Sequence, residues 1–250
     1  MHLFLIGIGT GNPDHLTLQA IKALNTADLI LIPRKGEGKA DLADLRLRIC
    51  ADVLTRPVPV AEFDLPTRDP ATPDYIARVN DWHGAIAAVW ASAISEHPTS
   101  HKVALLVWGD PSLYDSTLRI AARLTPAPQI TVIPGVTSLP VLTAAHAIPL
   151  NDLAAPVLIP TGRQLRDHGW PHGVDTLAVM LDGECSFQTI APQGVTIWWG
   201  AYVGMPEQII LSGPLADVTP TILQTRATAR AAHGWIMDIY LLRRQDSFSV

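Results

Sequence analysis

Two short apolar segments separated by one amphipathic helix constrain the fold of this chain more than any other feature. Residues 3–8 (LFLIGI) and 28–33 (DLILIP) have the composition of strands buried on both faces. Residues 16–27 place apolar side chains at helical spacing between them. A strand, a helix and a strand within about 30 residues form a βαβ unit, whose strands run parallel. The sequence therefore predicts an α/β domain with a parallel sheet.

The later segments extend this sheet and add a second domain. In the first half we expect strands at 102–108 and 129–133, helices at about 41–51, 75–94, 116–124 and 137–147, and loops elsewhere between 34 and 75. A boundary at 151–156 divides the chain into domains 1–150 and 151–250. The second domain contains candidate strands at 157–162, 176–183, 195–204, 207–215 and 234–244, with helices near 184–192 and 218–230. Short connections between some of these strands predict a mixed sheet.

Composition narrows the class of protein. Apolar residues make up 48% of the chain and charged residues 16%, against roughly 25% charged residues in an average globular chain, so a folded core is expected. The net charge of −5 disfavours a nucleic-acid partner. No apolar run is long enough to cross a membrane, and the N-terminus does not resemble a signal peptide. Cys50 and Cys185 form neither a disulfide framework nor a CxxC pair. We therefore expect a cytoplasmic protein with no membrane partner.

Glycine-containing turns follow three of the predicted strands, in the segments 7–14 (GIGTGNPD), 107–116 (VWGDPSLYDS) and 133–140 (IPGVTSLP). Glycine lets the backbone turn sharply and approach a ligand closely, and the carboxyl ends of parallel strands share the edge at which such sheets bind ligands. The first turn is not a dinucleotide fingerprint, because Asn12 stands where the third glycine is required. Each turn taken alone is also compatible with a purely structural role, such as loop or helix capping by Asp110 or Thr137.

The same turns carry a family pattern. It comprises Gly7, Gly9, Gly11 and Pro13 followed by Leu16-Thr17, then Gly109-Asp110-Pro111, then Pro134-Gly135 with Thr137-Ser138, and finally Met180 in VMLDG. In this order and spacing the chain resembles the tetrapyrrole (precorrin) methyltransferases, which use S-adenosylmethionine. The segments 21–42, 179–188, 198–215 and 234–244 are similar to those of family members that methylate C-1 of precorrin-5, release its acetyl group as acetate and give precorrin-6A and S-adenosylhomocysteine.

The resemblance implies an architecture and a cofactor site. It implies two α/β domains with a cofactor cleft between them, an N-terminal sheet that is mainly parallel, a mixed C-terminal sheet, and a homodimer. The residues that it assigns to S-adenosylmethionine are Pro13, Trp108, Gly109, Asp110, Leu113, Thr137, Ser138, Met180, Leu181, Ala201 and Tyr202. Transfer of a methyl group from sulfur to carbon is an in-line displacement that depends mainly on positioning, so no metal is expected.

The implied substrate and its deacetylation require further groups. A macrocycle with many carboxylates needs cationic donors, and Arg34, Lys35 and Lys39 follow the second strand at the expected ligand edge. Solvated loop charges are the alternative interpretation of these three residues. Removal of the acetyl group is helped by a general base; the candidate catalytic residues are Asp110, Tyr114 and Asp14, and the sequence does not choose among them.

Two other functions remain open at this point. The chain could be a methyltransferase of the same superfamily that acts on another precorrin or on RNA, although its acidic balance weighs against RNA. It could also be a non-catalytic ligand-binding module. The intact turns at 109–111 and 137–138 argue against that alternative.

Overall fold

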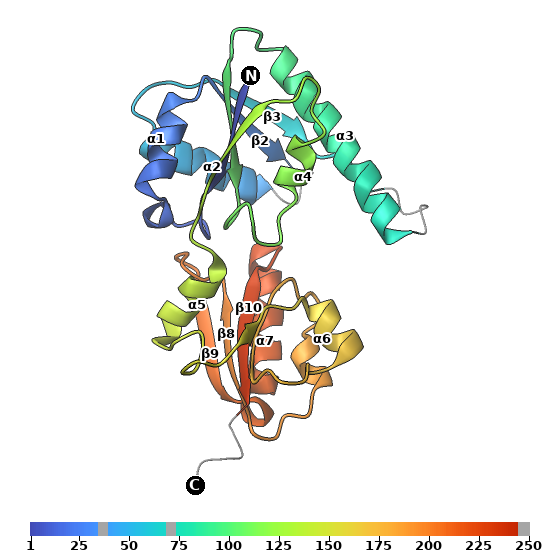
Figure 1. Cartoon of the computed structure of the whole chain (residues 1–250). Coiled ribbons are helices and arrows are strands. Elements are labelled where there is room, and N and C mark those ends of the chain that lie inside the picture. The colour runs from blue at the N-terminus through green and yellow to red at the C-terminus, as the bar shows by residue number, and fades with distance from the viewer. Residues whose placement is uncertain (35–39, 69–73, 245–250) are drawn as a thin grey trace. The chain divides into compact units, whose positions relative to one another are not determined.

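The chain forms two compact units, Met1–Thr137 and Ser138–Val250, in a computed structural model that describes residues 1–34, 40–68 and 74–244. Each unit contains one five-stranded sheet covered by helices (Figure 1). The first unit ends at Thr137, which is earlier in the chain than the expected boundary after residue 150. The reason is that helix α5 (Ser138–His146) packs against strands β8 and β10 of the second sheet.

The sheet of the first unit is entirely parallel, as predicted. Its strands are β1 (His2–Gly7), β2 (Leu29–Arg34), β3 (Val60–Asp64), β4 (Lys102–Val107) and β5 (Gln129–Ile133). Their order is β3-β2-β4-β1-β5, which places β1 between β4 and β5. The expectation of loops at 60–64 was wrong, because these residues form the edge strand β3. Only Phe63 of this strand is buried, so the sequence shows no apolar run there.

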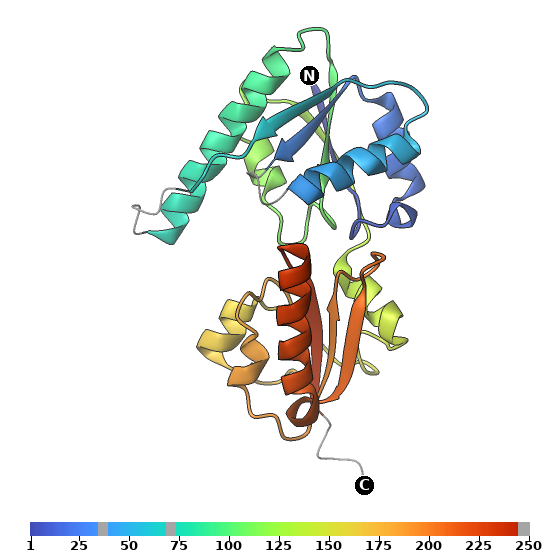
Figure 2. The ribbon, with the colours of Figure 1, turned by 180° about the vertical axis from the view of Figure 1, so that it is seen from behind.

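Helices cover both faces of the first sheet. They are α1 (Leu18–Thr26), α2 (Ala40–Val53), α3 (Tyr75–Ser95) and α4 (Thr117–Ala121), with a short 3-10 helix η1 (Pro13–His15) before α1. Figures 1 and 2 show α1 and α2 on one face and α3 and α4 on the other. Alternate residues of β1 face the two helix layers. Phe4 and Ile6 belong to the core under α1 and α2, whereas Leu3 and Leu5 belong to the core under α3 and α4.

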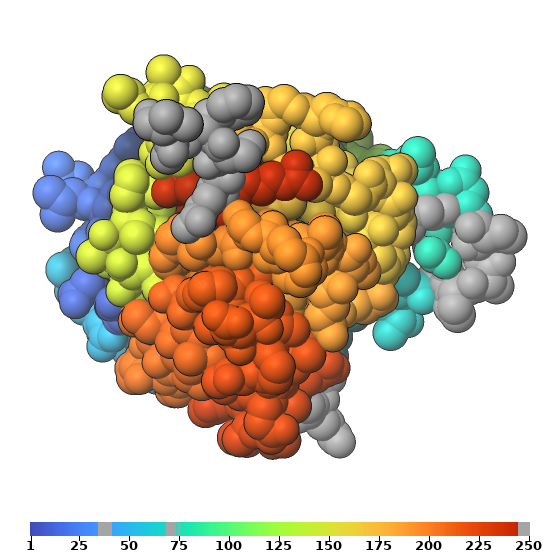
Figure 3. Space-filling model, turned by 90° about the horizontal axis from the view of Figure 1, so that it is seen from below, coloured from blue at the N-terminus to red at the C-terminus, as the bar shows by residue number. Residues whose placement is uncertain are grey.

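The sheet of the second unit is mixed, as predicted. Its strands are β6 (Val157–Leu158), β7 (Thr176–Val179), β8 (Val195–Ala201), β9 (Ile209–Pro214) and β10 (Asp238–Arg244), in the order β6-β7-β10-β8-β9. Only β6 and β7 pair in parallel. Figure 3 shows the end of the central strand β10, in red, with gold and orange residues on either side. The main core of the second unit lies under α7 (Leu215–His233), α6 (Gly162–His168) and the 3-10 helix η2 (Ser186–Thr189).

One predicted strand of the second unit is shorter than expected and is followed directly by a helix. Of the expected strand 157–162, residues 157–158 form β6, Thr161 makes a single parallel bridge with Met180, and α6 begins at Gly162. Thr161 starts this helix with a capping box, in which its side chain accepts a hydrogen bond from the Gln164 N–H and its own N–H donates to the Gln164 side chain. The sequence TGRQ contains this signal. None of the helices in the described ranges has the length and apolar character needed to span a bilayer.

Candidate functional site

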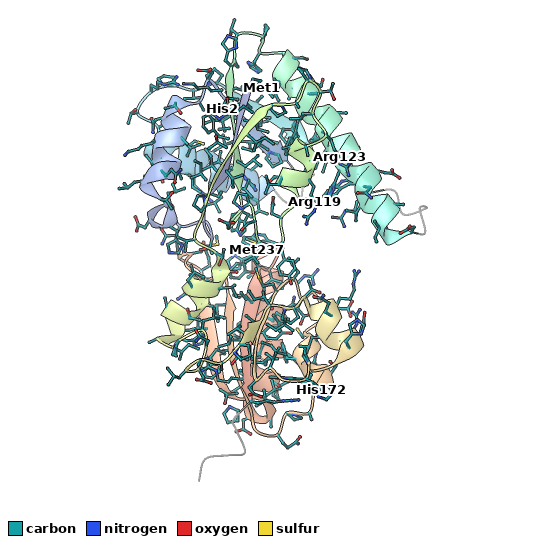
Figure 4. The ribbon with its side chains drawn as sticks, viewed as in Figure 1. Met1, His2, Arg119, Arg123, His172 and Met237 are labelled. Carbon is teal, nitrogen blue, oxygen red and sulfur yellow. The ribbon has the colours of Figure 1, made fainter. Side chains whose placement is uncertain are left out.

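The three glycine turns meet at one edge of the first sheet. Strands β4, β1 and β5 are adjacent and parallel, so the segments that follow them begin at the same edge. Met1 and His2, labelled in Figure 4, mark the opposite end of β1. The prediction that these turns share an edge is therefore confirmed.

Backbone hydrogen bonds join the first two turns. The Gly109 N–H donates to the Gly9 carbonyl at 2.8 Å, and the Gly9 N–H donates to the Gly109 carbonyl at 3.3 Å. The third turn is attached through Asp110, whose Oδ2 accepts a hydrogen bond from the Gly135 N–H at 2.8 Å. Hydrogen bonds therefore join all three turns to one another, and we call them the connected turns.

Glycine is required where these turns contact one another. A Cβ atom on Gly135 would lie 2.1 Å from the Gly109 carbonyl oxygen, and one on Gly7 would lie 2.6 Å from the Gly135 nitrogen. Gly109 differs from both: its φ is +65°, and a Cβ there would meet no described atom within 4 Å. The backbone at Gly109 is therefore open to the close approach of a ligand.

Asp110 is a buried carboxylate whose oxygens are already engaged. It is 9% exposed, and its Oδ1 accepts hydrogen bonds from the Ser112 N–H, at 2.7 Å, and from the Ser112 hydroxyl. Burial raises the pKa of Asp110, but the hydrogen bonds from Ser112 and Gly135 outweigh burial and lower that pKa overall. Its ionised form therefore stabilises the folded unit at neutral pH, a contribution lost as the pH falls through the lowered pKa. These contacts favour a positioning role for Asp110. Ser112 was not predicted as a site residue, although its place two residues after Asp110 is typical of such a turn.

The other candidates of the first unit lie on the segments that leave the connected turns. Pro13 and Asp14 are exposed on η1, while Trp108, Leu113 and Thr137 are half-buried. Tyr114 has a φ of +50° and is 42% exposed, and burial raises the pKa of its phenol. Tyr114 is therefore protonated at neutral pH and suits a hydrogen-bond donor better than a base.

The candidates of the second unit gather at one edge of its own sheet. Strands β7 and β8 both run antiparallel to β10, so Met180 and Leu181, after β7, lie at the same edge as Ala201 and Tyr202. Leu181 is 66% exposed, whereas Ala201 and Tyr202 are buried. The Tyr202 hydroxyl donates to the Trp235 carbonyl at 2.6 Å inside the core. This burial argues against direct contact between the Tyr202 ring and a cofactor.

The basic candidates are only partly described. Arg34 ends β2 and forms ion pairs with Glu62 and with Asp44, the latter at 3.8 Å. Its charge is therefore already compensated within the unit. Lys35 and Lys39 lie outside the described residues. Within the described ranges, no group of three or more His, Cys, Asp or Glu side chains is arranged to hold a metal ion.

Comparison with known proteins identifies relatives along the whole chain. The family profile described as Tetrapyrrole (Corrin/Porphyrin) Methylases matches residues 2–219. The chain is 47% identical to a precorrin-6A synthase [deacetylating] of Sinorhizobium sp, over 98% of this chain and 96% of the relative. It is similar to the crystal structure of a putative cobalamin synthesis related protein (CobF) from Corynebacterium diphtheriae, with a TM-score of 0.81, 36% identity, and coverage of 98% and 100%.

A more distant structure shares the fold. The uroporphyrin-III C-methyl transferase from Thermus thermophilus, complexed with S-adenosyl homocysteine, has a TM-score of 0.59 at 19% identity. The match covers 97% of this chain and 92% of that one.

Proposed function

The chain belongs to the tetrapyrrole (corrin/porphyrin) methylase family, and we propose that it transfers a methyl group from S-adenosylmethionine to C-1 of precorrin-5. The C-1 acetyl group leaves as acetate, and the products are precorrin-6A and S-adenosylhomocysteine. The observation that carries this proposal is the 47% identity to a precorrin-6A synthase [deacetylating], because it extends over 98% of the chain. Relatives that share only the fold support methyl transfer in general and do not specify the substrate. We also propose that the protein is cytoplasmic and forms a homodimer.

The glycine turns of the first unit fit the cofactor. A ligand bound through peptide groups needs backbone that no side chain covers, and Gly109 leaves such a place beside the Gly9–Gly109 hydrogen bonds. Thr137 and Ser138 add hydroxyl groups directly after the third turn. We assign the cofactor to Pro13, to 108–110, to Leu113 and to 137–138.

Positioning is the main contribution of these residues. When bound, S-adenosylmethionine would supply a methyl group on a positively charged sulfur, and the neutral thioether released by the transfer is a good leaving group. The Asp110 carboxylate holds the Gly135 and Ser112 peptide groups in place, so the turns are arranged before a ligand binds. Fixed orientation of two reactants contributes up to about 7–11 kcal/mol to lowering a reaction barrier.

Loss of the acetyl group requires a second set of contacts. Water, or an equivalent nucleophile, attacks the acetyl carbonyl, and a base accepts its proton. The bond between C-1 and the acetyl carbon then breaks, acetate leaves, and the electron pair of that bond stays on the macrocycle. Among the three catalytic candidates, only Asp14 has an exposed carboxylate, to which no described side chain donates a hydrogen bond. Asp110 is engaged by three donors and Tyr114 is protonated. We therefore assign the base role to Asp14.

Turnover of precorrin-5 tests the proposed function directly. The purified protein is incubated with precorrin-5 and S-adenosylmethionine carrying an isotopically labelled methyl group, and the products are analysed by mass spectrometry. We expect one labelled methyl group in the tetrapyrrole and one acetate for each S-adenosylhomocysteine formed. Methylation without acetate would instead support another precorrin methylase. Calorimetry that detects no binding of S-adenosylhomocysteine would support a non-catalytic module.

The variant Asp110→Ala tests the placement of the cofactor. It removes three hydrogen bonds to a carboxylate, and such bonds contribute about 1.5–3 kcal/mol each. Because the third turn loses its attachment, we expect the Kd for S-adenosylhomocysteine, measured by calorimetry, to rise about tenfold or more. The control is Asp81→Ala, which removes an exposed carboxylate of α3. Equal affinity in the wild type and in Asp110→Ala would show that the connected turns do not hold the cofactor.

A further inference from the structure

Strands β2 and β4 separate before they reach the carboxyl edge of the first sheet. Their ladder joins three residue pairs and ends at Leu31 and Leu105. Beyond that point β2 continues beside β3 alone, and β4 continues beside β1 alone. The helices that follow these two strands, α2 and α4, cover opposite faces. Such a reversal is the point at which open α/β sheets bind ligands.

The guanidinium of Arg46 lies where the two strands separate. Arg46 belongs to α2, and its Nε–H donates to the Leu106 carbonyl at 3.1 Å. The next carbonyl of β4, that of Val107, accepts a hydrogen bond from the Ile8 N–H on the β1 side. Because successive carbonyls of a strand point to opposite sides, the Leu106 carbonyl points toward β2. The Arg46 guanidinium therefore lies on the β2 side of β4, at a position where β2 no longer pairs with β4.

The charge of Arg46 has no close counter-charge in the described part of the chain. Its second hydrogen bond, from Nη1 to the Leu42 carbonyl at 3.0 Å, again goes to the backbone. No carboxylate of the described residues lies within 4 Å of it, and none of those residues accepts a hydrogen bond from its Nη2. Arg34, at the same edge, is instead paired with two carboxylates. Burial lowers the pKa of Arg46 to about 10, and the more distant Asp115 opposes this shift.

We propose that Arg46 is an anion-binding residue at this edge of the sheet. Its remaining guanidinium N–H groups donate hydrogen bonds to a carboxylate of a bound reactant. An arginine anchored by backbone carbonyls at Nε and Nη1 keeps its planar fork in a fixed orientation, and such a fork matches a carboxylate. The inference rests on the proposed function, because both reactants of that reaction carry carboxylates. They are the acidic side chains of the tetrapyrrole and the methionine carboxylate of the cofactor.

Two variants and one matched control test this inference. Arg46→Gln removes the charge, and Arg46→Lys keeps the charge but removes the fork. The control Arg48→Gln makes the same change at an exposed position of α2. The KM for precorrin-5 and the Kd for S-adenosylhomocysteine are measured for each protein, together with the midpoint of thermal unfolding.

We expect Arg46→Gln to raise one of the two constants about 10- to 100-fold, Arg46→Lys to raise it less, and Arg48→Gln to change neither. A rise in the KM for precorrin-5 identifies the substrate as the source of the carboxylate, and a rise in the Kd identifies the cofactor. Loss of a residue that only caps the Leu106 carbonyl would lower the unfolding midpoint and leave both constants unchanged.

The inference is overturned if folded Arg46→Gln has both constants of the wild type, or if Arg48→Gln shows the same change. Where Arg46→Gln does not fold, unchanged constants in Arg46→Lys overturn it. The wild-type turnover is measured first, so failure of the proposed function appears there and not in the variants. In that case the calorimetry with S-adenosylhomocysteine still tests Arg46.

Discussion

Gly135→Ala is expected to lower the free energy of unfolding by about 3 kcal/mol and to abolish binding of S-adenosylhomocysteine. The added Cβ would lie 2.1 Å from the Gly109 carbonyl oxygen and 2.8 Å from the Gly7 Cα. Both neighbours are backbone atoms of adjacent strand ends, so neither can rotate away as a side chain would. The three turns must separate, and the hydrogen bond from Gly135 to Asp110 is strained or lost.

Urea unfolding and calorimetry measure these two effects, and Gly84→Ala is the matched control. Gly84 lies inside α3 and is exposed, and a Cβ there would meet nothing within 4 Å. The same substitution should stabilise the protein at this position by about 0.5–1 kcal/mol, because alanine favours a helix over glycine. If Gly135→Ala had the stability and affinity of the wild type, the close contact of the three turns would be refuted.

Asp238→Ala is expected to cost about 3–5 kcal/mol of unfolding free energy, because it leaves a buried charge without its partner. The Asp238 Oδ2 is 2.8 Å from the Arg226 Nε, and the two side chains are 7% and 11% exposed. The same oxygen accepts a hydrogen bond from the Trp199 Nε1–H at 3.0 Å. Burial lowers the pKa of Arg226, but the hydrogen bond and charge of Asp238 raise that pKa more, so the guanidinium stays charged.

The control for this prediction is Glu207→Ala, which removes an exposed carboxylate of the same unit and should change the urea midpoint little. A double variant, Arg226→Met with Asp238→Leu, removes both charges together. It should recover most of the lost stability, because an apolar pair of similar volume avoids the cost of burying charge. A small effect of Asp238→Ala alone would show that Arg226 finds another partner or reaches water.

Local patterns were sufficient for most of the fold. The apolar runs at 3–8 and 28–33 indicated strands of a parallel sheet because a strand buried on both faces has no polar side to show. The short strand β3 escaped this argument, since it lies at the edge and buries only Phe63. Helix α6 was missed although its capping sequence TGRQ was present, because the preceding apolar residues were assigned to a longer strand.

The same contrast holds for the candidate site. Glycines at the ends of three strands predicted turns at one edge, and the adjacency of β4, β1 and β5 confirms it. Which of those glycines are needed for contact and which for access was not predictable. Gly135 and Gly109 look alike in the sequence, but one faces a carbonyl oxygen and the other faces open space.

The sequence by itself determined the class of the fold, the sheet edge at which the three glycine turns meet and the family of the chain, because strand burial, glycine turns and their order are local properties of the chain. Only the tertiary structure decided which charges are already matched. Arg34 at the end of β2 and Arg46 in α2 belong to the same βα segment. Glu62 compensates the charge of Arg34, whereas the guanidinium of Arg46 donates to the Leu106 carbonyl beyond the point at which β2 and β4 separate. The state of a buried charge depends on what folding brings within a few ångströms of it, and no local pattern records that neighbourhood.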